Sequence, residues 1–137
     1  MEMNTLPELP KQRKKKEANF GLIFRAWIEK NPQISGAFEL KQCEKSLPFS
    51  DVKDHQIASL RAVAGKGLLW KIADDSRGIK PFDYFYFRKA KAYIVIKFSD
   101  MFCLIDVNNF VLESFRDGRK SLTSERAKEI AEICVKI

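Results

Sequence analysis

The chain has 137 residues, 45% of them apolar, which is enough for one domain with a buried core. Its 25 lysines and arginines outnumber its 18 acidic residues, so the net charge of +7 favours a polyanionic partner such as DNA, RNA or an anionic membrane surface. Three scattered cysteines without a CxxC pair argue against a disulfide framework or a thiolate zinc site, and a single histidine, His55, argues against a histidine-rich metal centre. Any chemistry should therefore depend on carboxylates, lysine and a hard metal ion.

The N-terminal segment combines two prolines with the basic run KQRKKK. We expect residues 1–16 to form a flexible basic arm, which either keeps the protein soluble or contacts DNA phosphates, and residues 17–137 to form a single domain. The start of the chain lacks the apolar stretch of a signal peptide, and no apolar run approaches the roughly 20 residues that cross a bilayer. These features, with the scattered cysteines, predict a cytoplasmic protein.

Apolar residues recur at helical spacing between residues 17 and 30, so the sequence predicts a first helix there. Residues 34–42 alternate as in a strand, which places Ala37, Glu39 and Lys41 on one face. Ser50 is the expected N-cap of a second helix, and the glycines at 65 and 67 end it.

Four further strands are predicted at residues 67–72, 82–87, 92–98 and 101–107, the second and third of them forming a hairpin. We expect the aromatic residues of 82–87, and both tryptophans, to contribute to the core; the alternative for the aromatic strand is stacking on unpaired bases. Asn108–Asn109 indicates a turn, residues 110–114 allow a strand or a helical turn, and Thr123 is the expected cap of a last helix with Ile133 and Cys134 in its buried stripe. The order of these elements predicts an α/β protein with a mixed central β-sheet flanked by helices.

The triplet Glu39-Leu40-Lys41 is the E-x-K pattern of a nuclease site. In such a site the carboxylate binds Mg²⁺, and the lysine on the same face orients water or stabilises the developing charge. The alternative is an ordinary exposed charged pair. Two neighbouring features favour the site: the small residues 35–37 let another backbone or a ligand approach, and residues 74–83 gather three carboxylates, ending at Asp83 beside a strand. The alternative for that acidic segment is a solvated loop.

Several short motifs together resemble the PD-(D/E)xK-fold Holliday junction resolvases, especially the RecU-like and archaeal ones. The motifs are Glu17, Phe38-Glu39-Leu40-Lys41, Leu47-Pro48-Phe49, His55-Gln56 and the apolar strand 67–72. The resemblance covers about residues 17–72, with a looser match of the strands to about residue 110. It implies a restriction-endonuclease-like core and a homodimer acting on branched DNA.

The resemblance also implies a role for each matching residue. Glu17 would be a metal carboxylate from the first helix, Glu39 a metal ligand, Lys41 the residue that orients the water, and Gln56 a polar group near the scissile phosphate. The family's metal-binding aspartate belongs on a strand before E-x-K, and this chain has no acid there. We therefore expect Asp83 to supply that carboxylate from later in the chain, completing the site with Glu39 and Lys41.

The resulting prediction is a Mg²⁺-dependent endonuclease, with Mn²⁺ as the alternative ion, that cleaves four-way junctions or other branched DNA. Basic residues of the arm and of the Asp83 segment are expected to contact the nucleic acid. These are Lys14, Lys15, Lys16, Arg77, Lys80, Arg88 and Lys89. The main alternative is a non-catalytic nucleic-acid-binding protein on a degenerate nuclease fold. A protein-interaction domain using the aromatic strand and a hydrolase with another substrate are the remaining alternatives.

Overall fold

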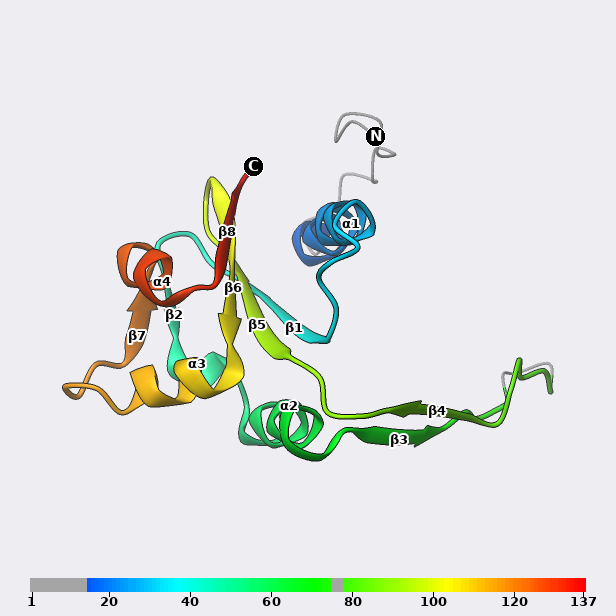
Figure 1. Ribbon diagram of the computed structural model, residues 1–137. Helices are drawn as coiled ribbons and strands as arrows, with labels where there is room; N and C mark the ends of the chain where they lie inside the picture. The colour runs from blue at the N-terminus through cyan, green and yellow to red at the C-terminus, as the bar shows by residue number, and fades with distance from the viewer. Residues whose placement is uncertain (1–14, 75–77) are drawn as a thin grey trace.

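A computed structural model describes residues 15–74 and 78–137, and the side chains from Asn19 onward. The chain is an α/β protein in which helices cover both faces of a mixed four-strand sheet (Figure 1). The predicted fold class is confirmed at this level. Residues 1–14 of the expected basic arm lie outside the described residues. Its last two residues, Lys15 and Lys16, begin the first helix. The elements are α1 (Lys15–Glu29), β1 (Ala37–Gln42), β2 (Ser46–Pro48), the 3-10 turn η2 (Phe49–Asp51), α2 (Asp54–Lys66), β3 (Leu68–Lys71), β4 (Tyr84–Phe87), β5 (Ala92–Lys97), β6 (Met101–Asp106), α3 (Val107–Ser114), β7 (Ser121–Thr123), α4 (Ser124–Ile130) and β8 (Ile133–Lys136).

The central sheet has the strand order β1-β5-β6-β8. β1 runs parallel to β5, with Ala37 opposite Ala92 and Gln42 opposite Lys97, whereas β5–β6 and β6–β8 are antiparallel pairs. The two inner strands are buried on both faces, which explains why residues 92–98 and 101–106 read as nearly continuous apolar runs. β1 is an edge strand, with no strand partner on one of its sides among the described residues.

Helix α1 covers one face of the sheet. Its Phe20 and Phe24 are buried against β6, with ring centroids 5.7 Å and 6.0 Å from Phe102, and Phe24 also meets Phe38 of β1 edge-on at 5.1 Å. Trp27 joins the same cluster, 5.3 Å from Phe102, as predicted. Edge-to-face packing of this kind adds to the free energy of simple apolar burial. Even-numbered residues of β1 therefore face α1.

The opposite face carries α2, α3, α4 and the small β2–β7 pair. Leu47, Leu60, Phe110 and Leu122 bring these elements onto the inner strands β5 and β6, where Ile94, Ile96, Cys103 and Ile105 are completely buried. The odd-numbered residues of β1, among them Glu39 and Lys41, belong to this face, as their alternation predicted.

Three local predictions were wrong. Asn108 and Asn109 are in α3, because the Asp106 carboxylate accepts hydrogen bonds from both of their backbone N–H groups and caps the helix. α2 begins after Lys53 and not after Ser50, because Gln56 Oε1 accepts the Lys53 backbone N–H in a capping box. Ile133 and Cys134 lie in β8, since the chain leaves the helix at Ala131 and pairs with β6. The Thr123 cap itself is confirmed by its bond to the Arg126 N–H.

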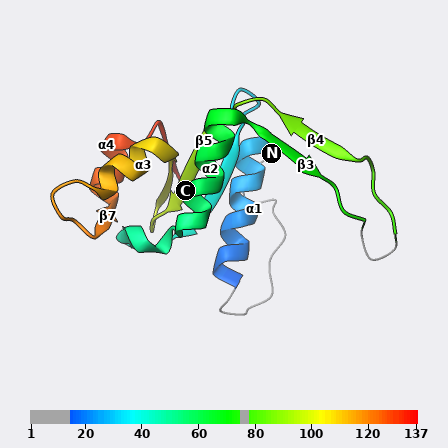
Figure 2. The same ribbon diagram turned by 90° about the horizontal axis from the view of Figure 1, so that it is seen from below.

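Strands β3 and β4 form a two-stranded antiparallel ribbon that projects away from the central sheet (Figures 1 and 2). The expected hairpin between residues 82–87 and 92–98 is therefore wrong, because β4 pairs with β3 and β5 pairs with β1 and β6. The expectation that these aromatic residues and Trp70 are core residues is also wrong: Trp70 is 59% exposed and Phe85 is 46% exposed. Residues 67–72, matched to the resolvase core by resemblance, lie in this ribbon and not in the four-strand sheet.

Candidate functional site

Glu39 and Lys41 lie side by side on β1, on the face that α2 covers. Because residues two apart on a strand point the same way, the Lys41 ammonium reaches the Glu39 carboxylate, with 3.6 Å between Nζ and Oε2. Both side chains are partly buried, Lys41 being 20% and Glu39 29% exposed. Partial burial removes some of the water that would otherwise screen this ion pair, while leaving the carboxylate open to a ligand.

Gln56, in the first turn of α2, completes the group. Its Nε2 donates a hydrogen bond of 3.1 Å to Glu39 Oε2, across 17 residues of sequence. Its Oε1 accepts the backbone N–H of Lys53 at 2.9 Å, so the capping box that starts α2 also fixes the orientation of the amide. We call Glu39, Lys41 and Gln56 the Glu39 cluster. The structure thus brings together three of the five predicted catalytic residues.

Asp83 is not part of the Glu39 cluster. Gln56 lies at the start of α2 and the ribbon leaves from its end, after Lys66, about 15 Å along the helix axis. Asp83 is roughly 16 Å further along the ribbon, where its carbonyl accepts the Ile72 N–H. Its carboxylate is 72% exposed and pairs with Lys80 at 3.1 Å. Mg²⁺ ligands must lie within about 6 Å of one another, so within one copy of the chain the predicted sharing of a metal ion by Glu39 and Asp83 is wrong.

Glu17, the fifth predicted catalytic residue, lies in α1, and its side chain is outside the described part of the structure. The helix packs on the face of β1 that carries Phe38 and Leu40, opposite the face that carries Glu39. Within residues 15–74 and 78–137, no group of three or more histidine, cysteine, aspartate and glutamate side chains is placed to hold a metal ion. Glu39 is the one carboxylate in the Glu39 cluster.

The predicted nucleic-acid contacts are divided between described and undescribed positions. Lys80, Arg88 and Lys89 lie on or beside the ribbon. The Arg88 guanidinium sits over the Tyr86 ring, 5.3 Å from its centroid, and Lys80 pairs with Asp74 and Asp83. Lys14 and Arg77 fall outside the described residues, as do the side chains of Lys15 and Lys16.

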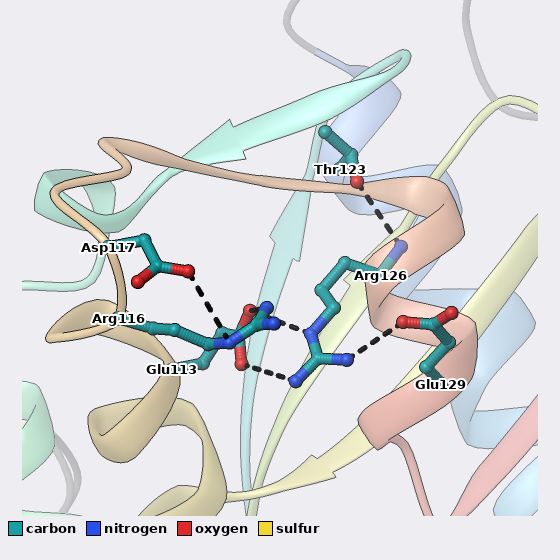
Figure 3. Close-up of polar contacts among 6 residues, drawn as sticks. All are labelled: Glu113, Arg116, Asp117, Thr123, Arg126 and Glu129. Carbon is teal, nitrogen blue, oxygen red and sulfur yellow. Dashed lines mark hydrogen bonds and ion pairs between the residues drawn. The ribbon is translucent and has the colours of Figure 1, made fainter.

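A buried ion pair that the sequence analysis missed joins α3 to α4 (Figure 3). Glu113 is only 5% exposed, and the Arg126 guanidinium donates two hydrogen bonds to it, of 2.8 Å and 3.1 Å. These bonds lower the pKa of the Glu113 carboxyl below its usual value, and Arg116, 3.6 Å away, acts in the same direction. The only signal in the sequence is a glutamate among apolar residues in 107–115, which is too common a pattern to single out this residue.

The thiols do not add a nucleophile to the Glu39 cluster. Cys43, the next residue but one after Lys41, has a pKa raised to about 11, mainly because it is partly buried. Cys103 lies directly opposite Cys134 in the β6–β8 pair, with 2.8 Å between the sulfur atoms, and burial raises the pKa of Cys103 strongly. Cys43 and Cys103 are therefore neutral at physiological pH, whereas the thiolate is the nucleophilic form.

Comparison with known proteins adds no assignment. The chain matches no family model, and a search of curated proteins finds no significant relative. None of the helices in the described residues is long and apolar enough to span a bilayer.

Proposed function

We propose that the protein is a metal-dependent endodeoxyribonuclease of the Holliday junction resolvase type, with the Glu39 cluster as its centre. The observation that supports this proposal is the hydrogen bond between Gln56 and Glu39. It joins two motifs of the resemblance to the resolvases that lie 17 residues apart in the sequence, E-x-K on a strand and H-Q on a helix. A chance E-x-K triplet has no reason to lie against that glutamine, so their contact favours a shared chemical role. The restriction-endonuclease-like core remains part of the proposal.

Within the proposed mechanism, each residue of the cluster has a role that follows from its contacts. Glu39 presents a carboxylate whose Oε2 is held by Gln56 and paired with Lys41. The Lys41 ammonium is positioned to orient an attacking water molecule and to stabilise the charge that develops on the phosphate. Gln56, fixed by its own bond to the Lys53 N–H, holds the carboxylate in place and so limits reorganisation during the reaction.

A hard divalent cation fits this donor set only through Glu39. Mg²⁺ commonly binds through one or two carboxylates and takes its remaining oxygen ligands from water and substrate phosphates. When bound, the ion would supply an activated water molecule and neutralise phosphate charge. One protein carboxylate predicts weak binding in the absence of DNA, and either Mg²⁺ or Mn²⁺ suits an oxygen ligand of this kind.

The position of β1 at the sheet edge supports a polymeric substrate. A duplex cannot enter a closed pocket, and the Glu39 and Lys41 side chains are partly exposed on an edge strand. The net charge of +7 favours such a polyanion, and the ribbon places further cations beyond the sheet. Branched DNA is proposed from the resemblance to the resolvases.

The second candidate is a nucleic-acid-binding protein that does not cut. The observation in its favour is that Glu39 is the one carboxylate in the cluster, and that its Oε2 already has two partners. In that case Lys41 and Gln56 would neutralise and anchor Glu39 as a structural group. DNA binding would then be independent of divalent metal ions.

The deciding experiment is cleavage of a labelled four-way junction and a linear duplex of matched sequence, with Mg²⁺, Mn²⁺ or EDTA. We compare the full chain with Glu39→Gln, which keeps the shape of the side chain and removes its charge. Glu44→Gln, an exposed glutamate just after β1, is the matched control. Metal-dependent cleavage that falls at least about 100-fold in Glu39→Gln and persists in the control is expected. Binding without cleavage under either metal would favour the second candidate.

A further inference from the structure

The β3–β4 ribbon has two chemically different faces. Residues directly opposite in an antiparallel pair share a face, so Leu68, Trp70, Phe85 and Phe87 lie together on one side. The rings of Phe85 and Phe87 stack at 5.6 Å, and Phe82 meets Phe85 edge-on at 4.9 Å. We call these five residues the apolar face. The other side, the polar face, carries Leu69, Lys71, Tyr84 and Tyr86, with Arg88 over the Tyr86 ring.

Four aromatic side chains of the apolar face are about half exposed. Trp70 is 59%, Phe87 49%, Phe85 46% and Phe82 45% exposed. An aromatic side chain buries about 150–250 Å² when fully covered, so these four leave roughly 400 Å² of ring surface in water, as much as the largest apolar patch of a typical monomer. An isolated two-stranded ribbon is also marginally stable at best, and neither ribbon strand pairs with the central sheet. The exposed aromatic surface and the marginal stability of a lone ribbon both favour a partner that covers the apolar face.

We propose that the apolar face packs against the same face of a second copy of this chain. The five residues of the face carry no charge, whereas a surface that tracks nucleic acid combines aromatic rings with cations. On this ribbon, Lys71 and Arg88 belong to the polar face. An uncharged stripe is self-complementary under a two-fold axis, which brings identical patches together.

The area of the apolar face is compatible with an interface between two copies of the chain. A stable interface buries about 800 Å² per partner, and the four rings of each copy supply about half of that before Leu68 and the ribbon backbone are counted. Packing two twisted ribbons face to face would make a small four-stranded sandwich with rings interdigitating between the layers. The polar faces of both ribbons, with Lys71 and Arg88, would remain open to solvent. The resemblance to the resolvases implies a homodimer but no interface; the interface proposed here is argued from the ribbon alone, a surface remote from the Glu39 cluster.

The test measures the oligomeric state of the full chain by sedimentation velocity over a range of concentrations. The informative variant is Phe85→Ser with Phe87→Ser, and the matched control is Tyr84→Ser with Tyr86→Ser, which removes two rings from the opposite face of the same strand. We expect a dimer whose Kd rises at least about 100-fold in the phenylalanine variant and changes less than about fivefold in the tyrosine control. Circular dichroism of both variants verifies that the central domain stays folded.

A second measurement follows the surface directly. In Trp27→Phe protein, Trp70 is the remaining tryptophan and reports burial of the apolar face by its emission maximum. The emission should shift to longer wavelength on dilution through the Kd. A chain that is monomeric up to about 100 µM, or a dimer equally weakened by both pairs of substitutions, would overturn the proposal. So would a Trp70 signal that changes only when single-stranded DNA is added, because the occupant would then be nucleic acid.

Discussion

At the scale of single residues, two glutamate side chains, Glu39 and Glu113, are each held in place by one side chain from a neighbouring helix. Glu39 is oriented by Gln56, and Gln56 is oriented by the Lys53 N–H, so a helix cap and the candidate site share one side chain. Glu113 is held in the same way by Arg126, which also reaches Glu129 within its own helix. The first arrangement leaves the carboxylate 29% exposed and the second leaves it 5% exposed. Only the first is therefore open to a ligand, and the second is expected to affect stability.

The Glu113 pair predicts a specific loss of stability in acid. The folded-state pKa of Glu113 lies below its unfolded value, so its contribution is complete above the unfolded pKa, near 4.5, and is lost as pH falls through the folded pKa. Glu113→Gln should lower the Tm at pH 7 by about 5 °C or more, because the two arginines lose their carboxylate. This difference should shrink as the pH falls below about 4.5, because the unfolded chain then binds a proton at residue 113 that the folded chain still resists, and the wild-type advantage declines.

Thermal melts from pH 3 to pH 7 measure this effect. Glu129→Gln is the control, because Glu129 also bonds Arg126 but is 65% exposed. Its Tm should follow that of wild type within about 2 °C, as exposed pairs contribute little. A Glu113→Gln difference that is the same at both ends of the pH range would contradict the linkage.

At the scale of secondary-structure elements, the sequence predicted the elements better than it predicted their partners. The helical period of α1 and the alternation of β1 are local signals, and both placed their side chains on the correct faces. Strand pairing is not local. Only four residues separate β4 from β5, which favoured a hairpin, yet β4 pairs with β3 across a longer connection. Aromatic alternation in residues 82–87 predicted burial, but the ribbon has no layer packed on it in one copy of the chain. The proximity of Gln56 to Glu39 came from the family resemblance, since no period relates residues 17 apart.

The glycine before β1 sets how that strand meets its neighbour, and this gives a prediction for the element. Gly36 has φ +147°, and a Cβ there would lie 2.3 Å from the Lys91 carbonyl oxygen. The adjacent Ala37 N–H donates to that same oxygen at 3.0 Å, so Gly36→Ala must displace the start of the β1–β5 pair. We expect a loss of about 1–3 kcal/mol in the free energy of unfolding, measured by urea denaturation.

Gly21 is the matched control for this substitution. It lies in α1, and a Cβ added there would meet no atom of the neighbouring elements within 4 Å in the described part of the chain. Gly21→Ala should leave stability unchanged or raise it by up to about 1 kcal/mol, because alanine favours the helix. Equal losses in both variants would show that the approach of Lys91 is not what requires glycine at residue 36.

At the scale of the whole molecule, the proposed catalytic residues and the basic residues proposed to bind DNA lie on different parts of the fold. The Glu39 cluster lies on the central sheet under α2, whereas Arg88 and Lys89 lie where the ribbon returns to it. Counterion release makes the affinity for DNA fall with salt, and the slope of log K against log salt reports how many phosphates are neutralised. If the protein binds DNA as proposed, its net charge of +7 favours salt-dependent binding.

Replacing Arg88 and Lys89 together by serine should therefore reduce that slope by about 2 and weaken binding to all sequences alike. Lys128→Ser with Lys136→Ser removes the same charge from α4 and β8, on exposed positions distant in the fold from the ribbon. Fluorescence anisotropy of a labelled duplex between 50 and 200 mM salt, about the range over which such contacts are resolved, measures both variants. If the two lower the slope equally, only net charge matters and no surface is selected. A loss confined to the ribbon variant, with cleavage still dependent on Glu39, would separate the residues that bind DNA from those that cut it.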